Sequence, residues 1–377
     1  MSTATATFVE VAKARRWHAF DWQLLLYLLL LVGFGAVMGY SANYQAIGGG
    51  GLSQTVKTLI WTSIGLTLFF VAANLDYHWL QTFATPIYLI VLGLLLATWL
   101  IGRNLFGAQM SISVAGIDFQ FSEMSKVLMI VVLAAFLASR REKIGRLSTI
   151  VGAGLLMALP AYLVYRQPDL GTALVFVAIL LGMLFMSGAG VGWLALLGGV
   201  TVALAPIAVG ALAAYQRQRL FCFLDPSADP QGACYQVVQA LNTVGSGGLL
   251  GQGLTAGRQN QLGFLPVQST DFIFTVVAEE LGFLGGMILL ALFALLMWRV
   301  LKVGWAARDP FGANIAAGLG SLLLFQITVN IGMVTGIMPV TGIPLPFITY
   351  GGSSMISLLF GMGLLQSVRV HAWKPTF

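Results

Sequence analysis

Residues 269–298 read STDFIFTVVAEELGFLGGMILLALFALLMW, an aspartate followed by a long apolar run that contains only two further charges. An apolar run of about 18 residues or more with few charges is typical of a transmembrane helix. The rest of the chain has the same character, because 58% of its 377 residues are hydrophobic and 8% are charged, whereas about 25% are charged in a typical soluble domain. The sequence therefore predicts an all-α integral membrane protein.

Ten apolar segments are predicted to span the membrane. They are residues 22–42, 56–74, 80–101, 122–139, 148–165, 172–187, 193–214, 272–298, 313–338 and 353–370. Lysines and arginines concentrate beside alternate span ends, above all in SRREKIGRLS at 139–148, and such residues favour the cytoplasmic side. We therefore expect a ten-span domain at 22–370 between a cytoplasmic N-terminal segment at 1–21 and a cytoplasmic tail at 371–377. The net charge of +6 is then a signal of topology, and no nucleic-acid partner is expected.

The main mass outside the membrane is predicted to be a long outward loop at 215–270, before the eighth span. It contains both cysteines of the chain, Cys222 and Cys234. A disulfide between them would suit an extracytoplasmic position, and two buried, unbridged side chains are the alternative. A further outer segment, GIMPVTGIPLPFITYGGSS at 336–354, contains three prolines. This predicts non-helical backbone packed against protein or a water-lined cavity.

The two glutamates of the opening stretch, Glu279 and Glu280, are expected inside the eighth span, roughly 12 Å deeper than Asp271 at about 1.5 Å per residue. Charges at such depth normally have a partner. The obvious cation is Lys126, which shares a helix face with Glu123 three residues earlier. We therefore predict a buried network of Lys126, Glu123 and one of the two glutamates. It would either lock helices together or line a cavity that binds an anionic substrate.

Asp271 has two interpretations from the residues alone. It could complement the start of its helix, or it could act chemically at the outer membrane surface. The three histidines, His18, His78 and His371, all fall on the predicted cytoplasmic side. This placement excludes a histidine-dependent triad or metal site on the outer face, so general-base chemistry there would fall to a carboxylate.

Arginines on the predicted outer side could bind phosphate, because the guanidinium group suits forked contacts to its oxygens. The candidates are Arg103, Arg166, Arg217, Arg219 and Arg258. The alternative role for each is to reach the lipid headgroups from a span end.

Five motifs occur in an order and spacing that resemble one known family. They are FQFSEMSK (119–126), QPDLGTAL (167–174), LDPSADPQGACYQVVQALNTVGSGGLLGQGL (224–254), LPVQSTDFIFTVVAEELG (265–282) and GIMPVTGIPLPFITYGGSS (336–354). Together they resemble the SEDS family, the RodA, FtsW and SpoVE membrane proteins of bacterial cell-wall synthesis. The resemblance covers residues 22 to 370 and favours the RodA-like type.

The resemblance implies a peptidoglycan glycosyltransferase of the bacterial cytoplasmic membrane, which polymerises lipid II on the outer face. A class B penicillin-binding protein is the implied partner. The family's catalytic acid falls on Asp271, and substrate-binding positions fall on Glu123, Lys126 and Asp169. A single carboxylate base with direct displacement would invert the anomeric carbon.

The leaving group in such a reaction is a polyprenyl pyrophosphate, whose negative charge must be stabilised by cations. Arg217, Arg219 and Lys126 are the candidates for the pyrophosphate, and Arg258 is a further substrate-binding candidate. A divalent cation, Mg²⁺ or Mn²⁺, could bind at Asp271. No organic cofactor is expected.

Three positions depart from the family pattern. Phe121 stands in place of a proline, Val267 in place of an acid, and Ser269 in place of a frequent histidine. These departures affect the prediction of the detailed substrate contacts and of the subfamily more than the prediction of the reaction.

Two other functions compete with polymerisation. A flippase that moves the same lipid would also use intramembrane charges and a proline-broken segment, although the inner halves of the ten spans contain almost no charge. A scaffold that positions a penicillin-binding protein would not need Asp271 for chemistry.

Overall fold

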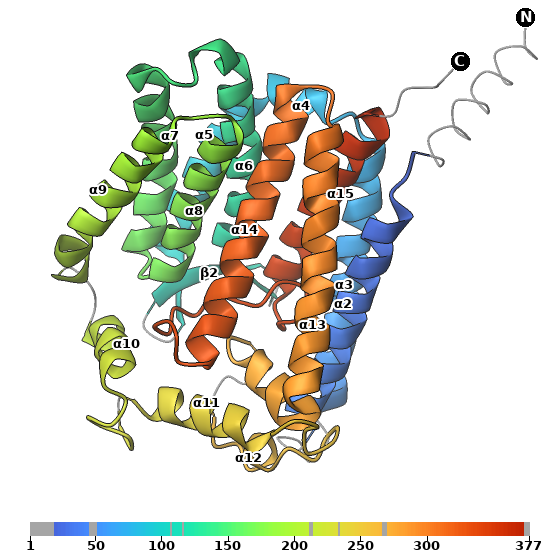
Figure 1. Cartoon of the computed structure of the whole chain (residues 1–377), viewed down its shortest axis with the longest axis vertical. Coiled ribbons are helices and arrows are strands. Elements are labelled where there is room, and N and C mark those ends of the chain that lie inside the picture. The colour runs from blue at the N-terminus through green and yellow to red at the C-terminus, as the bar shows by residue number, and fades with distance from the viewer. Residues whose placement is uncertain are drawn as a thin grey trace, which may run out of the picture.

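The computed structural model describes residues 19–44, 51–105, 108–114, 117–210, 214–232, 234–265 and 270–372. The helices are α2 (Trp22–Ala42), α3 (Gly51–Asn74), α4 (His78–Thr82), α5 (Ala84–Ile101), α6 (Phe121–Ser139), α7 (Leu147–Arg166), α8 (Leu170–Met186), α9 (Val191–Gly210), α10 (Ala214–Leu224), α11 (Tyr235–Ser246), α12 (Arg258–Gln261), α13 (Ile273–Ala306), α14 (Pro310–Val334) and α15 (Gly352–Ala372), with a 3₁₀ turn at Arg141–Lys143. The strands are β1 (Arg103–Leu105), β2 (Ala108–Val114) and β3 (Ile117–Phe119). Figure 1 shows the helices packed side by side as an elongated bundle.

The ten predicted spans correspond to ten of these helices. Eight helices of the described chain are long and apolar enough to cross a membrane, and α8 and the first part of α9 are shorter apolar helices. The all-α membrane fold is therefore confirmed. The start of α2 and the end of α15 lie at one end of the bundle, and α10, α11 and α12 lie at the other (Figure 1). The long loop at 215–270 thus lies opposite the described ends of the chain.

The outer segment before α6 contains a small sheet that the sequence did not predict. Strands β1, β2 and β3 pair antiparallel in that order, and β2 packs beside α5 and α6. Pairing the strands satisfies their backbone hydrogen-bonding groups where a helix does not form.

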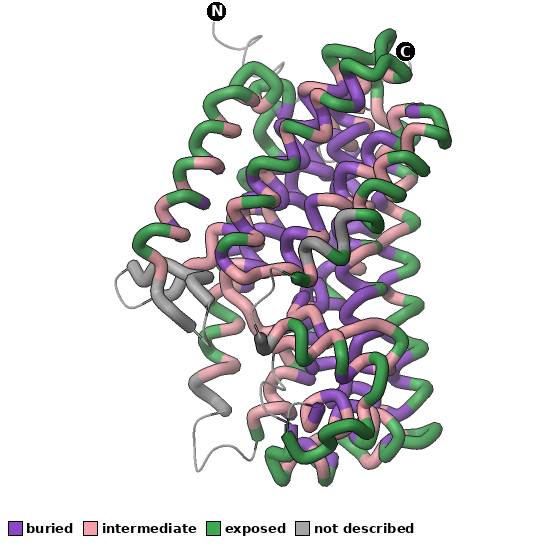
Figure 2. Tube along the Cα trace, turned by 90° about the vertical axis from the view of Figure 1, so that its left-hand side faces the viewer, coloured by how far each residue is buried: buried purple, intermediate pink, exposed green. Residues whose placement is uncertain are grey.

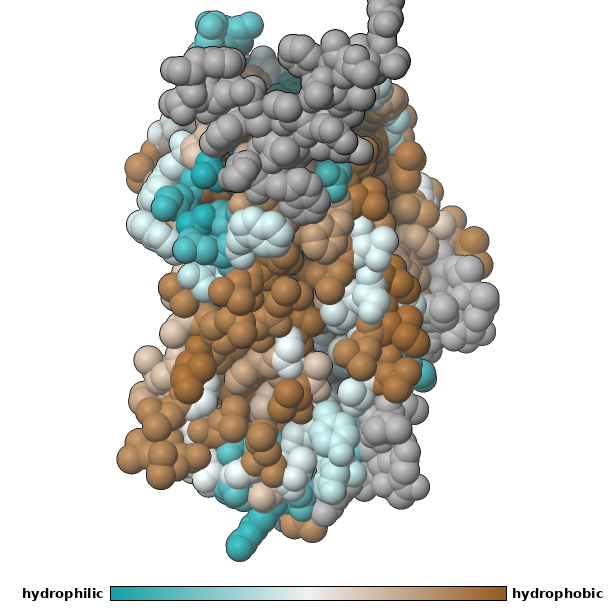
Figure 3. All heavy atoms as spheres, turned by 90° about the vertical axis from the view of Figure 1, so that its right-hand side faces the viewer, coloured by the Kyte–Doolittle hydropathy of each residue, from teal (hydrophilic) through white to brown (hydrophobic). Residues whose placement is uncertain are grey.

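The core lies along the centre of the bundle, around α6, α14 and α15. In each of these three helices 72% of the most apolar window is buried, against 17% in α5 and 28% in α3. Figure 2 shows this buried centre with exposed residues around it. On the face drawn in Figure 3, a broad apolar band lies between polar residues towards the two ends. The peripheral helices thus present apolar side chains to lipid, while the central helices bury theirs against one another.

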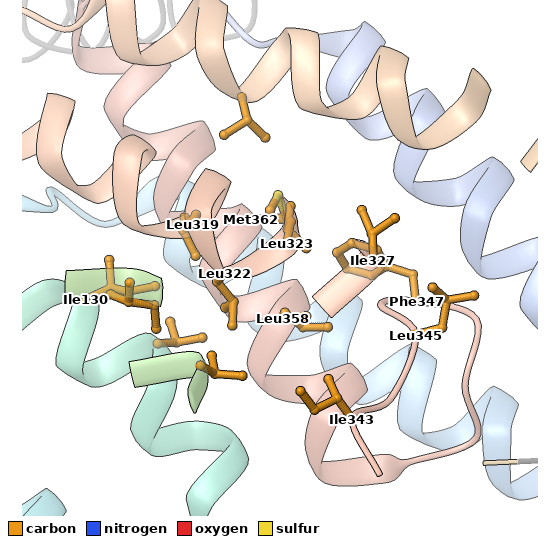
Figure 4. Packing of buried hydrophobic residues seen from close by; sticks show 14 of the residues in the cluster. Ile130, Leu319, Leu322, Leu323, Ile327, Ile343, Leu345, Phe347, Leu358 and Met362 are labelled. Atoms are coloured by element: carbon orange, nitrogen blue, oxygen red, sulfur yellow. The ribbon is translucent and has the colours of Figure 1, made fainter. Parts of the chain in front are cut away.

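Residues 335–351 between α14 and α15 form no helix, as the prolines predicted. This re-entrant segment returns into the bundle, where Ile343, Leu345 and Phe347 belong to the buried hydrophobic cluster drawn in Figure 4. Glycines let it approach other helices closely: a Cβ on Gly35 of α2 would lie only 2.7 Å from the Phe347 carbonyl oxygen. The non-helical backbone is therefore buried against protein, as backbone at membrane depth must be.

The disulfide between Cys222 and Cys234 is present. It joins α10 to the residue that precedes α11, and both cysteines are almost fully buried. The outward loop thus contains three short helices, which the sequence did not predict, and the disulfide, which was one of the two interpretations of its cysteines.

The eighth span is not the straight helix that the sequence predicted. Gly282 has φ 67° and ψ −164°, which breaks α13 into a short first segment and a long second one. All 34 residues as one straight helix would be about 51 Å long, well beyond a hydrocarbon core of about 30 Å. The first segment instead joins the outward loop, because the Gln252 amide donates to the Glu279 carbonyl and the Gly253 amide to the Glu280 carbonyl, each at 2.9 Å. The prediction that the two glutamates lie about 12 Å deeper than Asp271 is therefore wrong.

Candidate active site

Asp271 lies just before the first segment of α13, and its backbone is held from two sides. The Asn330 side-chain amide of α14 donates to the Asp271 carbonyl at 2.9 Å and to the Ile343 carbonyl at 2.7 Å. Asn330 is fully buried. One amide group therefore ties the start of α13 to the re-entrant segment.

The Asp271 carboxylate is not the cap of its helix. Phe272 occupies the N-cap position of α13, and no side-chain hydrogen bond caps that end. Within the described chain, no hydrogen bond to the Asp271 carboxylate is found either. The capping interpretation is therefore wrong, and the carboxylate is available for another role.

Gly342 of the re-entrant segment lies directly beside this carboxylate. A Cβ on Gly342 would be 3.3 Å from Asp271 Oδ2 and 3.9 Å from Arg219 Nη1 of α10. Gly342 also has φ 73°, a conformation that favours glycine. Three segments far apart in the sequence thus bring an acid and a guanidinium group to one point.

Glu123 and Lys126 form a buried ion pair at the start of α6. Lys126 Nζ donates to Glu123 Oε1 at 2.6 Å, and the two side chains are only 1% and 4% exposed. The second oxygen, Glu123 Oε2, is buried and has no hydrogen-bond partner in the described chain. A buried carboxylate oxygen without a partner is costly, so this pair is poised to accept a hydrogen bond from a ligand.

Asp169 interacts electrostatically with this ion pair and with Asp271. Its carboxylate accepts from the Thr172 amide at 2.9 Å and so caps α8. Burial raises the pKa of Asp169, while the Lys126 cation lowers it and the Glu123 carboxylate raises it. Because Lys126 and Glu123 are close enough to affect Asp169, the three residues share one polar region.

The charges of this region also affect the pKa of Asp271. Burial raises it to about 7, the Arg219 guanidinium acts in the opposite direction, and the Asp169 and Glu123 carboxylates raise it further. A carboxyl group with this pKa exchanges its proton near neutral pH, as a general base requires. The predicted residues Asp271, Glu123, Lys126, Asp169 and Arg219 are thus brought together.

The other predicted arginines have different surroundings. Arg217 donates from Nη2 to the Gly210 carbonyl at 2.8 Å, at the end of α9. Arg258 is exposed at the start of α12, and Arg166 lies 5.3 Å from the Trp99 ring centroid. The side chain of Arg103 lies outside the described residues. A substrate-binding role for Arg217 and Arg258 therefore stays a prediction.

Glu279 and Glu280 do not pair with Lys126, so this part of the predicted network is wrong. Glu279 accepts from the Gln259 and Asn260 amides at 2.7 and 3.0 Å. Glu280 accepts from the Ser41 hydroxyl of α2 at 2.6 Å and from the Asn260 side chain at 3.2 Å. The two buried acids therefore fasten the outward loop to α13 and α2.

The departures from the family pattern lie mostly beyond what the structure describes. Val267 and Ser269 are outside the described residues. Phe121 begins α6, and its ring lies 5.0 Å from that of Phe119. An aromatic contact therefore occupies the position where the family has a proline.

A metal site is not preformed here. Among the described residues, no group of three or more His, Cys, Asp or Glu side chains could hold a metal ion. Mg²⁺ commonly binds one or two carboxylates together with substrate phosphates and water. A cation at Asp271 would therefore depend on oxygens supplied by the substrate.

Sequence reasoning missed two residues of the site. Asn330 is a buried amide within the apolar helix α14, and a lone polar residue in such a span is the signal that could have found it. Gly342 lies between prolines in the re-entrant segment. No local sequence pattern indicates that this segment returns to Asp271.

Comparisons with known proteins identify one family. The family model FtsW/RodA/SpoVE, described as a cell cycle protein, matches residues 22–374. The peptidoglycan glycosyltransferase MrdB of Escherichia coli K12 is 38% identical over 356 residues, which cover 93% of this chain and 94% of MrdB. Stage V sporulation protein E of Bacillus subtilis is 35% identical, with 92% and 96% covered.

Two solved structures are similar over almost the whole chain. The rod shape determining protein RodA of Thermus thermophilus has a TM-score of 0.72 at 29% identity, with 95% of this chain and 99% of RodA covered. A chain from a study of polymerization and crosslinking by a peptidoglycan synthase complex has a TM-score of 0.79 at 31% identity, with 94% and 99% covered.

Proposed function

This chain belongs to the FtsW, RodA and SpoVE family, and we infer that it is a peptidoglycan glycosyltransferase that polymerises lipid II. The environment of the Asp271 carboxylate is the observation that assigns this function to a particular residue. This carboxylate is partly buried, does not cap its helix, has a pKa of about 7 and lies beside Arg219. A base of this kind is what transfer of a sugar to a hydroxyl group requires.

In the proposed reaction, the Asp271 carboxylate takes the proton of the acceptor sugar hydroxyl. The hydroxyl oxygen then forms a bond to the anomeric carbon of the donor. The bond from that carbon to the pyrophosphate oxygen breaks, and its electron pair leaves with the polyprenyl pyrophosphate. Direct displacement of this kind inverts the anomeric carbon.

Lys126 and Arg219 are the proposed cations for the leaving pyrophosphate. Lys126 is buried, and Glu123 is its one ion-pair partner among the described residues. Arg219 approaches the same region from α10. Preorganised cations in a site with little water stabilise developing negative charge strongly. A divalent cation, bound by Asp271 and by substrate oxygens, would supply additional charge stabilisation, and this remains a proposal.

The proposed setting is the bacterial inner membrane, with both ends of the chain in the cytoplasm. The positive-inside bias supports this orientation, and it places α10, α11, α12 and Asp271 on the outer side. One structural relative comes from a peptidoglycan synthase complex, which supports a class B penicillin-binding protein as the partner.

The test compares polymer formed from labelled lipid II by the purified chain with its penicillin-binding partner, for the wild type and Asp271→Asn. Asparagine keeps the size of the side chain and removes the base, so we expect a loss of about 100-fold or more. Asp76→Asn is the matched control, because Asp76 is exposed at the opposite end of the bundle.

Two results would each contradict a different part of this proposal, the first the function and the second the role of Asp271. A wild-type protein that moves lipid II across vesicles without forming polymer would be a flippase. A folded Asp271→Asn protein that polymerises as well as wild type would leave the enzyme assignment in place but remove Asp271 from the chemistry.

A further inference from the structure

A cavity of about 250 Å³ lies at the end of the bundle opposite Asp271. It is formed where α6, α8 and the α13–α14 connection end or begin. Its polar lining comes from Arg141, Arg308, Ser187 and Asn314, and its apolar lining includes Leu137 and Met186. The polymerisation reaction uses none of these residues.

The two arginines of this cavity are positive charges without an ion-pair partner among the described residues. Both are exposed, and neither guanidinium has an ion pair or hydrogen bond within the described chain. Arginines on a membrane protein surface often reach towards lipid headgroups, but these two converge on one cavity from different connections.

The single carboxylate of the lining does not neutralise them. Asp309 Oδ1 accepts from the Gly312 amide at 2.9 Å and caps α14. Asp309 Oδ2 accepts from the Tyr77 hydroxyl and lies 3.6 Å from His78 Nε2. Both oxygens thus have other partners, and with two arginines against one aspartate the cavity keeps a positive character.

The polar and apolar residues of the lining indicate what type of ligand the cavity could bind. Ser187 donates to Asn314 Oδ1 at 2.8 Å, which fixes the Asn314 amide at the cavity, where its nitrogen can donate to an oxygen ligand. The volume is smaller than the roughly 300–1,000 Å³ of pockets that enclose a drug-sized molecule. It therefore suits a headgroup rather than a whole lipid.

We propose that this cavity binds the phosphate of an anionic ligand, with a phospholipid headgroup of the inner leaflet as the primary source and free phosphate as the other. Arg141 and Arg308 contact the phosphate oxygens, Asn314 donates to them, and Leu137 and Met186 contact the start of the acyl region. Basic pockets between membrane helices on the cytoplasmic side are suited to such headgroups. The inner-leaflet source rests on the proposed orientation, whereas phosphate binding itself does not.

The experiment is native mass spectrometry and thermal melting of the purified full chain with three additives: phosphatidylglycerol, phosphatidylcholine and inorganic phosphate. We expect phosphatidylglycerol to be retained and to raise the melting temperature more than phosphatidylcholine does. The double variant Arg141→Gln, Arg308→Gln should bind it roughly tenfold more weakly or worse, since each lost contact is a charged hydrogen bond. Protection by inorganic phosphate alone would identify free phosphate as the source.

Two further variants separate the site from general surface charge and from folding. Lys143→Gln, Arg146→Gln removes the same charge from exposed positions that do not line the cavity, and it should keep wild-type binding. Ala313→Leu fills the cavity and leaves both arginines in place, and it should lose binding. Equal retention of phosphatidylglycerol by all variants, or equal stabilisation by phosphatidylcholine, would overturn the proposal.

Discussion

Replacing Arg219 with glutamine should move the pH dependence of polymerisation to higher pH. Asp271 must be ionised to accept a proton, so the rate should rise with pH through its pKa of about 7. The Arg219 cation favours the ionised form and lowers that pKa. Without the cation, a higher pH is needed to ionise the same fraction of the carboxylate.

The structure sets the size of this effect. Asp271 Oδ2 and Arg219 Nη1 lie within 3.3 and 3.9 Å of the same point, so they are at most about 7 Å apart. At this distance, Coulomb's law gives about 0.6 kcal/mol in water and about 2.4 kcal/mol at an effective dielectric constant of about 20. Since about 1.4 kcal/mol corresponds to one pH unit, the midpoint should rise by about 0.4 to 1.7.

The assay measures kcat/KM for lipid II between pH 5.5 and roughly 9, the range in which the free enzyme's base is expected to titrate. The control is Asp169→Asn, which removes a charge that raises the pKa of Asp271. Its midpoint should move to lower pH, whatever it does to the maximum rate. Opposite shifts distinguish an effect on Asp271 from a general loss of substrate binding.

Two outcomes would refute the reasoning. If Arg219→Gln lowers the rate by the same factor at every pH, Arg219 binds substrate without affecting the base. If neither variant moves the midpoint, the group that titrates in the profile is not Asp271.

Three further predictions follow from other contacts of the site. Asp271→Asn should raise the melting temperature at pH 8 but not at pH 4. Burial raises the pKa of Asp271 in the folded protein to about 7, above its usual 3.8, so the fold loses stability as the pH rises from 3.8 to 7, by at most about 4 kcal/mol before solvent screening. Ser41→Ala should destabilise the fold by about 1–3 kcal/mol, measured by thermal melting, because buried Glu280 loses a hydrogen-bond donor. The variant should also be cleaved faster by proteases at 247–260. An unchanged cleavage rate would contradict this prediction. Asn330→Ala should lower kcat at pH 8 with little change in KM, because Asp271 and Ile343 lose their shared donor, and an unchanged kcat would show that the clamp does not position the base.

Much of the fold could be predicted because its signals are local. Long apolar runs marked all ten apolar helices, and the prolines of 336–354 marked the non-helical segment. The Glu123–Lys126 pair was predictable for the same reason, since residues three apart on a helix face each other. Asp271 was found as an acid that precedes an apolar run.

The failures concern partners that lie far away in the sequence or that are not side chains. Glu279 binds backbone amides of Gln259 and Asn260, and Glu280 binds a serine 239 residues earlier. A search for a cation partner could not find these groups, because any residue can supply an amide. Reading the eighth span as a straight helix added a second error, although Gly282 lies in a glycine-rich stretch, LGFLGG.

The three acids of the opening stretch therefore have two different roles, and the break at Gly282 explains why. Because the chain turns at Gly282, the first segment of α13 and the loop at 247–260 form one hydrogen-bonded layer. The Gln259 and Asn260 backbone amides in this layer need acceptors, which Glu279 supplies. Glu280 accepts from the Ser41 hydroxyl and the Asn260 side chain. The same turn places Asp271 at the far end of the segment, against Gly342 and Asn330, where it needs no cap and can act on a substrate. Glutamine at 279 or 280 would therefore loosen the loop, whereas asparagine at 271 would remove the base and leave the layer intact.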